Sequence, residues 1–190
     1  MKNKSFLSWI INPFTHIAGG KALIIGLFIQ LLTVFFGNMA GMHFDGALDL
    51  HIGAKLTLLQ DFCLWLISTG SLILVLYASG LILTRRFRFI DLAGTVLLAR
   101  TLFILSMVAI LLVEIPPAET IITNPSVMLT IPILVLTAFS IVIMIWYIVL
   151  LYNAYKISVG LKTDKAVISF VIALAVAEIM SKVLIINLIK

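Results

Sequence analysis

The sequence predicts an all-α integral membrane protein, a bundle of five transmembrane helices with a short N-terminal interfacial helix. Hydrophobic residues make up 63% of the chain and charged residues only 11%. Long apolar runs recur five times, and the Lys and Arg content of the segments between them alternates between rich and poor. An average soluble domain has about a quarter charged residues, so a soluble chain of 190 residues could not cover this much apolar surface.

The five apolar runs are each expected to cross the bilayer as one helix. A helix of about 20 residues spans a hydrocarbon core of roughly 30 Å. Continuous runs favour helices over a β-barrel, whose strands alternate apolar and polar residues. Pro132 is expected to kink the fourth run, and aromatic residues at its end to lie at the membrane interface. The runs cover residues 21–38, 58–83, 90–113, 127–151 and 166–188, and the aromatic residues are Trp146, Tyr147, Tyr152 and Tyr155.

Two regions divide the chain: residues 1–20 as a cytoplasmic interfacial segment and residues 21–190 as the five-span transmembrane domain. A signal peptide is not favoured, because Pro13 interrupts the first apolar stretch and no cleavage site follows it. The segment is instead expected to form a short helix at the lipid interface, with lysines near anionic head groups. Its apolar side would consist of Phe6, Trp9, Ile10 and Phe14, with Lys2, Lys4 and Lys21 as the lysines.

Charge alternation predicts the orientation, because short cytoplasmic loops are enriched in Lys and Arg. One side holds Lys2, Lys4, Lys21, Arg85, Arg86, Arg88, Lys156, Lys162 and Lys165, and the other side only Lys55 and Lys190. The N-terminus is therefore expected in the cytoplasm and the C-terminus outside. The net charge of +5 is attributed to this topology signal and not to nucleic-acid binding.

Four charged residues inside the spans form a predicted buried polar cluster: Arg100, Glu178, Lys182 and Asp61. A charge at the centre of a membrane helix costs roughly 2.5–3.5 kcal/mol, so such residues should face inward and pair. Arg100 and Glu178 lie at similar depths and are expected to contact each other directly or through one water. Glu178 and Lys182 can also pair at i,i+4. The cluster is either a structural set of ion pairs or part of a proton or ion pathway.

Small residues in two spans favour close helix packing or interhelical hydrogen bonds. The second span contains Ser68, Thr69, Gly70 and Ser71, and the third contains Gly94 and Thr95.

The first outer loop has two histidines and two aspartates in mirror order: His43, Asp45, Asp49 and His51. Imidazole and carboxylate groups together suit zinc or another divalent ion. Their spacing matches no established zinc motif, however, and Asp45-Gly46 favours a turn. A polar outer-face loop is therefore the preferred interpretation. No cofactor is expected, and a divalent metal at these four residues is the alternative.

Enzyme motifs are missing from the sequence, which has no His-Glu-x-x-His, Gly-x-Ser-x-Gly or Walker segment. A non-enzymatic function is therefore expected. Two alternatives stay open: a small transporter or channel component that uses the Arg100 and Glu178 charges, and a metal-dependent membrane enzyme that uses the His43–His51 loop.

The chain resembles the Yip-domain family, small five-helix membrane proteins named for Ypt-interacting protein. The resemblance covers nearly the whole chain: Asn12-Pro13-Phe14-Thr15 before the first span, five closely spaced helices, and an aromatic end of the fourth span followed by a basic link with Gly160. It implies a cytoplasmic N-terminus and a role in organising membrane or binding partners. Eukaryotic members carry a longer N-terminal region and act in vesicle traffic with small GTPases.

The compact form is similar to bacterial members of that family, which implies a location in the bacterial cytoplasmic (inner) membrane. The expected partners are the lipid bilayer, other membrane proteins and further copies of the chain itself.

Overall fold

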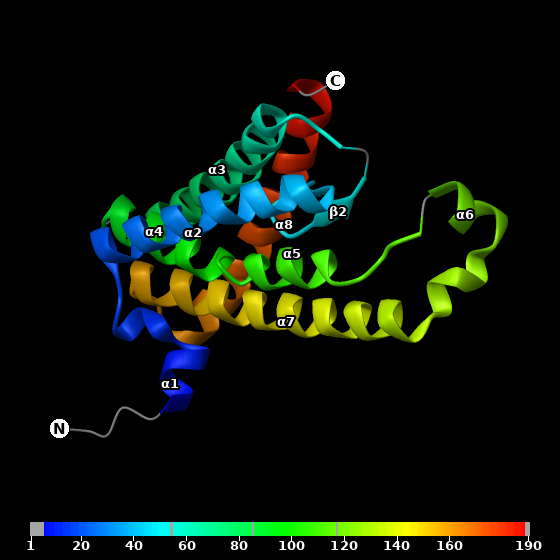
Figure 1. Ribbon diagram of the computed structural model, residues 1–190. Helices are drawn as coiled ribbons and strands as arrows, with labels where there is room; N and C mark the ends of the chain where they lie inside the picture. The colour runs from blue at the N-terminus through cyan, green and yellow to red at the C-terminus, as the bar shows by residue number, and fades with distance from the viewer. Residues whose placement is uncertain (1–5, 54, 85, 117, 189–190) are drawn as a thin grey trace.

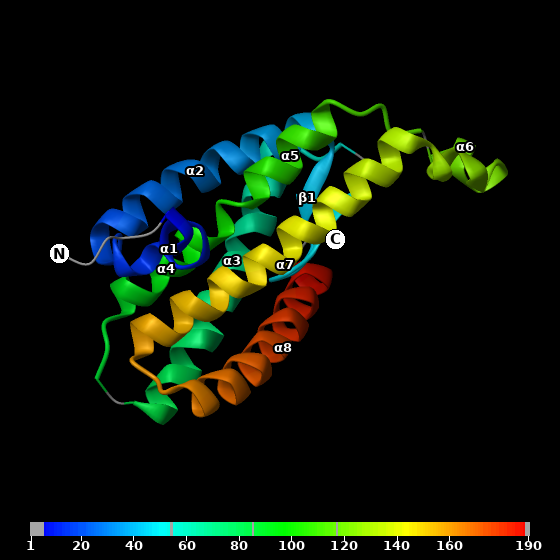
Figure 2. The same ribbon diagram turned by 90° about the horizontal axis from the view of Figure 1, so that it is seen from below.

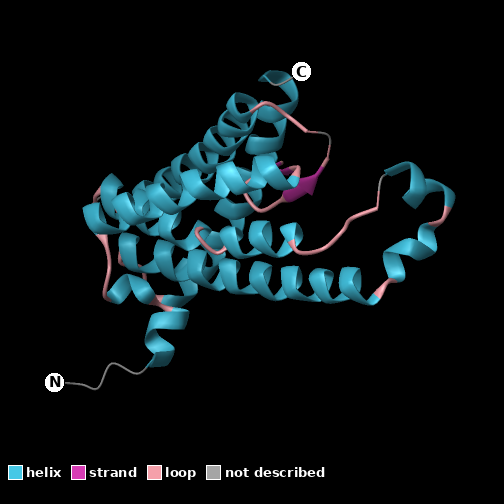
Figure 3. Cartoon of the chain, viewed as in Figure 1, coloured by secondary structure: helices cyan, strands magenta, loops and turns pink. Residues whose placement is uncertain are grey.

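The computed structural model describes residues 6–53, 55–84, 86–116 and 118–188. Within these residues, five helical stretches are long and apolar enough to cross a membrane. They are α2 (Gly19–Ala40), α3 (Leu58–Leu83), α4 and α5 together (Phe89–Leu111), α7 (Ile131–Val159) and α8 (Thr163–Leu188). Figure 3 shows a fold made almost wholly of helices, with one short pair of strands. The predicted all-α fold is confirmed, and the five apolar helices identify a polytopic membrane protein.

The third span consists of two helices, α4 (Phe89–Arg100) and α5 (Phe103–Leu111), joined by a tight turn. The amides of Thr101 and Ile104 each donate to a carbonyl three residues earlier, which is the 3-10 pattern. The Thr101 hydroxyl also donates to the Leu98 carbonyl at 2.7 Å. The turn tightens the helix directly after Arg100 without ending the span.

The fourth span starts later and ends later than its apolar run predicts. It begins at Ile131, and Pro132 stands in its first turn, where a missing N–H is not needed. Pro132 therefore starts the helix, and the expected kink is wrong. The helix continues to Val159 because its last turns are still packed in the bundle. Tyr147 and Tyr155 are fully buried there, so they are core residues and not interfacial aromatics.

The N-terminal segment forms α1 (Phe6–Ile11) and a short 3-10 turn, η1 (Pro13–Thr15). It packs against α7, where the Trp146 indole donates to the Ile10 carbonyl at 2.8 Å and the Asn153 amide donates to the Ile11 carbonyl at 2.9 Å. Phe14 lies in the separate turn and is buried in the core. It therefore does not share an interfacial helix face with Trp9, as the sequence had suggested.

The helices form two sets that cross. Helix α2 packs along α4 and α5, and α4 packs on α7, while α3 packs along α8. Figure 1 shows α2, α5 and α7 running in similar directions, with α3 and α8 inclined to them, and Figure 2 shows the same bundle from below. The loop before α7 carries α6 (Ala118–Thr123) and the turn η2 (Pro125–Leu129), which project from one end.

The surface of the bundle is apolar, as a hydrocarbon environment requires. Large aliphatic side chains are more than two thirds exposed on several helices, among them Ile24, Leu59, Ile82 and Ile131. The third span is the central one: 61% of its most apolar stretch is buried, against 28–39% in the other four spans.

The contact between α2 and α4 is so close that two glycines are needed. A Cβ on Gly26 would lie 2.7 Å from the Leu98 nitrogen, and a Cβ on Gly94 would lie 2.6 Å from the Gly19 carbonyl oxygen. The two backbones therefore touch directly, which confirms the expected close packing at Gly94. A Cβ on Gly70 would meet nothing within 4 Å, so the expected close contact at Gly70 is wrong.

The charge alternation leads to a topology prediction that fusions can test. An odd number of spans puts the two termini on opposite sides of the membrane, and the basic loops favour a cytoplasmic N-terminus. Reporter fusions after Lys4, Arg88 and Lys162 should report the cytoplasm, and a fusion after Lys190 the outside. A cytoplasmic C-terminus would contradict the five-span arrangement.

Candidate functional site

A β-hairpin follows α2 and enters the helix bundle. Gly41 ends α2 in the left-handed conformation (φ 65°) and turns the chain back. Strand β1 (Met42–Phe44) then pairs antiparallel with β2 (Leu50–Ile52), with His43 opposite His51. The tip of this re-entrant hairpin, residues 45–49, contains Ala47, which is fully buried. The expected polar outer-face loop is therefore wrong for β1 and the tip, which are buried in the bundle, while His51 and Ile52 of β2 are exposed.

Arg100, near the middle of the third span, binds the hairpin tip. Its Nη1 donates to the Ala47 carbonyl at 2.6 Å and to the Tyr147 hydroxyl at 3.2 Å. Its Nη2 donates to the Ser68 hydroxyl at 3.3 Å. The guanidinium carbon lies 5.0 Å from the centre of the Phe44 ring and 5.3 Å from that of Phe103. Cation–π attraction adds to the hydrogen bonds where both groups are desolvated, and Arg100 is 0% exposed.

Helix α8 binds the same tip through Glu178 and Ser181. The Leu48 amide donates to Glu178 Oε2 at 2.9 Å, and the Ala47 amide donates to Ser181 Oγ at 3.0 Å. A Cβ on Gly46 would collide with the Glu178 carboxylate in its present position, so a larger residue there would require the Glu178 side chain to shift. Side chains thus satisfy three polar backbone groups of the tip, the Ala47 N–H and carbonyl and the Leu48 N–H, as non-helical backbone at membrane depth requires.

Arg100 and Glu178 do not form the expected direct ion pair, and the peptide group between Ala47 and Leu48 lies between them. Arg100 binds the carbonyl oxygen of that group, and Glu178 accepts from its N–H. The cation and the anion therefore polarise one peptide group from its two ends. The physical reason is that the hairpin tip enters the bundle here, so each charge contacts the backbone of the tip and not the other side chain.

Lys182 forms the expected ion pair with Glu178, at 3.2 Å, and a second one with Asp49 of the hairpin, at 2.5 Å. The side chains of Lys182 and Asp49 are 41% and 47% exposed, and that of Glu178 is 20% exposed. Exposed ion pairs contribute little to stability in water. Here the second pair links the hairpin tip to α8 once more, beside the buried contacts of Ala47 and Leu48.

Asp61 belongs to a different group from the other three residues of the predicted cluster. In the first turn of α3, it lies 2.5 Å from His43 Nδ1 and accepts from the Asn38 amide at 2.6 Å. His43 and Asp61 are both buried. The predicted cluster is thus two groups: Asp61 binds the base of the hairpin, and Arg100, Glu178 and Lys182 bind its tip.

The four metal candidates point to different partners. His43 pairs with Asp61, Asp49 pairs with Lys182, and His51 is exposed on β2. The Asp45 amide donates to the Asp49 carbonyl across the loop, at 3.2 Å. Among the residues that the structure describes, no three His, Cys, Asp or Glu side chains come together in a group that could hold a metal ion.

Several residues of the site carried no signal of their own in the sequence. Tyr147 looked like an interfacial aromatic, yet its hydroxyl donates to the Ala47 carbonyl at 3.2 Å. Asn38 is an isolated polar residue near the end of α2, and Ser181 in α8 stands beside Glu178 and Lys182, whose charges were the stronger signal. The sequence did contain one signal for these residues. An arginine side chain has five N–H donors, so a buried Arg100 needs more acceptors than the single carboxylate of Glu178.

Chemically, this arrangement fixes a segment in place. The formal charges of Arg100, Lys182, Glu178 and Asp49 cancel, and the backbone of the tip is held from three spans. No protein-family model, curated protein or solved structure matches this chain. A function for this chain is therefore inferred from its geometry and its sequence.

Proposed function

We propose that the chain is a non-enzymatic polytopic membrane protein of the Yip-domain type, located in a bacterial cytoplasmic membrane. It would organise membrane or bind partner proteins through its helices and basic cytoplasmic loops. The observation that supports this most is the internal use of the central charges. Arg100 is fully buried, and its terminal nitrogens donate to Ala47, Ser68 and Tyr147.

A transport site needs charged groups that exchange partners with the transported ion. Arg100 is enclosed by the rings of Phe44, Phe103 and Tyr147, and releasing it would leave the Ala47 carbonyl with only the Tyr147 hydroxyl. Stranding a buried charge costs several kcal/mol. A static role is therefore favoured for this group.

One feature supports a second candidate function, a small transporter or channel component. The third span tightens into a 3-10 turn directly after Arg100, and a re-entrant segment meets it there. Interrupted helices and non-helical backbone near the membrane centre are common where secondary transporters bind their substrates. Glu178, at 20% side-chain exposure, would be the residue that binds or releases a proton.

Reconstitution distinguishes these two functions. We expect purified protein in liposomes to leave the proton permeability and the flux of small ions unchanged, because Arg100 is buried and hydrogen-bonded within the bundle and Glu178 is paired with Lys182. A pH-sensitive dye inside the vesicles measures this, with an ionophore as positive control. Flux that disappears when Glu178 is replaced by Gln would favour the transporter.

Energy transfer in the same liposomes tests whether the protein associates with itself. Copies labelled with donor and acceptor dyes should show energy transfer if they associate. Absence of energy transfer would remove the support for self-association.

A further inference from the structure

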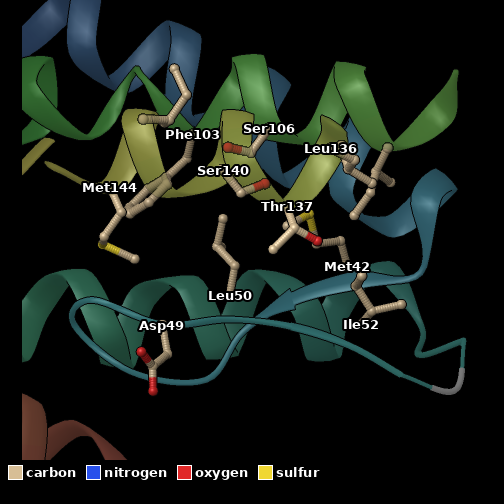
Figure 4. A pocket seen from close by; sticks show the side chains of 12 residues that line it. Met42, Asp49, Leu50, Ile52, Phe103, Ser106, Leu136, Thr137, Ser140 and Met144 are labelled. Carbon is tan, nitrogen blue, oxygen red and sulfur yellow. The ribbon is translucent and has the colours of Figure 1, made fainter. Parts of the chain in front are cut away.

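A cavity of about 290 Å³ lies between the hairpin, α5 and α7. Its volume is just below the range for sites that enclose a whole small molecule, roughly 300–1,000 Å³. Most of its lining is apolar, with Met42, Leu50, Phe103, Ile110 and Ile143 among the residues. Figure 4 shows Leu50 and Met42 on the hairpin opposite the side chains of α7, and the Asp49 carboxylate on the other side of the strand.

Two serine hydroxyls on this cavity have no hydrogen-bond partner. Ser106 of α5 is 4% exposed, and Ser140 of α7 is half-buried; both line the cavity, and neither makes a hydrogen bond within the described structure. Helical Ser and Thr commonly donate to the carbonyl four residues earlier, as Thr137 does at 2.9 Å beside them. The hydroxyl oxygens of Ser106 and Ser140 are not among the fully buried polar atoms that lack a partner in the described residues, so both are accessible from the cavity. The two serines therefore fit a ligand that carries an acceptor oxygen.

The cavity opens toward the lipid-facing surface. Thr137 and Ile52 border it, and both are exposed, Ile52 at 44%. Next to Thr137 on α7, Leu134 and Val135 are also exposed and apolar. In a membrane this surface meets hydrocarbon, so the occupant arrives from the bilayer. It needs an apolar chain for the lining and a carbonyl oxygen for the two serines.

We propose that this cavity binds one phospholipid from the leaflet on the hairpin side of the bundle. One acyl chain packs against Met42, Leu50 and Ile110, and an ester carbonyl accepts hydrogen bonds from Ser106 and Ser140. An ester carbonyl is a pure acceptor at the edge of the hydrocarbon layer, which matches two hydroxyl donors placed among apolar side chains. The proposal does not depend on the function proposed above, since a scaffold and a transporter could both hold a lipid here.

Native mass spectrometry of the protein released from nanodiscs tests this binding. Nanodiscs of phosphatidylethanolamine and phosphatidylglycerol should yield protein that retains one phospholipid. A hydrogen bond contributes about 1 kcal/mol, so Ser106→Ala or Ser140→Ala should each lower retention about fivefold. The matched control is Thr33→Val, which removes a buried hydroxyl that only donates to the carbonyl of Ile29 in α2. This control should retain the lipid like the parent protein.

Photolabelling locates the lipid independently. A phospholipid with a diazirine on its acyl chain should label peptides of α5 and α7, and Ser140→Phe, which fills the cavity, should remove that labelling. If Ser140→Phe does not fold, the two alanine variants still decide the matter through the loss of labelling. Equal retention in all variants, uniform labelling of the spans, a retained free fatty acid, or ordered water alone in the cavity would overturn the proposal.

Discussion

Replacing Arg100 with methionine is expected to lower the free energy of unfolding by about 3–5 kcal/mol. Methionine keeps much of the apolar volume but leaves the Ala47 carbonyl with only the Tyr147 hydroxyl. It also leaves the carboxylate of Glu178 in the bundle without the cation on the other side of the Ala47–Leu48 peptide group. Unfolding in mixed detergent micelles, followed by circular dichroism, measures the change.

Two variants serve as controls for this prediction. Arg86→Met removes an exposed arginine from the basic turn before α4 and should change stability by less than about 0.5 kcal/mol. Arg100→Lys keeps the charge but cannot reproduce the planar set of donors, and it should fall between the parent protein and Arg100→Met. A loss as small in Arg100→Met as in Arg86→Met would contradict the role of the buried guanidinium.

The double variant Arg100→Met/Glu178→Met separates a direct ion pair from contact through a peptide group. If the two charges paired directly, removing both would restore much of the lost stability. Since each binds its own end of the Ala47–Leu48 peptide group, removing both leaves the Ala47 carbonyl with only the Tyr147 hydroxyl and removes the acceptor of the Leu48 N–H. We therefore expect the double variant to be at least as unstable as Arg100→Met alone. Recovery of stability would favour a direct pair in the membrane.

The five spans could be predicted from the sequence because each depends on one property, the length of an apolar run. The pair of Glu178 and Lys182 could be predicted for a similar reason, since residues four apart in a helix are neighbours. The end of the fourth span could not be predicted from the sequence. Asn153, Tyr155 and Lys156 look like the end of an apolar run, yet the helix continues to Val159 because tertiary packing decides its length.

The re-entrant hairpin is the part of the site that sequence reasoning missed. His43, Asp45 and Asp49 make the segment look like a solvent-exposed loop, and a polar loop and a re-entrant one have similar compositions. Its burial depends on partners far away in the chain, such as Ser181, which accepts from the Ala47 amide. The depth of Arg100 in its span predicts a charged side chain on another helix as its partner, but the backbone of the hairpin tip lies closer. Arg100 and Glu178 thus lie close together as predicted, but they contact each other through a peptide group.

The second large effect is expected at the two glycines where α2 meets α4. Gly26→Ala and Gly94→Ala should each lower the free energy of unfolding by about 1–3 kcal/mol, because overpacking forces the helices apart. The added Cβ would lie 2.7 Å and 2.6 Å from backbone atoms of the opposite helix, and backbone atoms cannot move aside as a flexible side chain can. Thermal unfolding in detergent measures the loss.

Gly70→Ala provides the matched control, since it makes the same change inside a span. Its Cβ would meet nothing within 4 Å, so helix propensity alone acts and favours alanine by up to about 1 kcal/mol. A similar loss in all three variants would show that glycine content, and not the α2–α4 contact, determines the effect. The combined Gly26→Ala/Gly94→Ala variant should lose less than the sum of the single variants, because both glycines lie in one interface. Once α2 has moved away from α4 to accommodate the first methyl group, part of the clash of the second is already relieved.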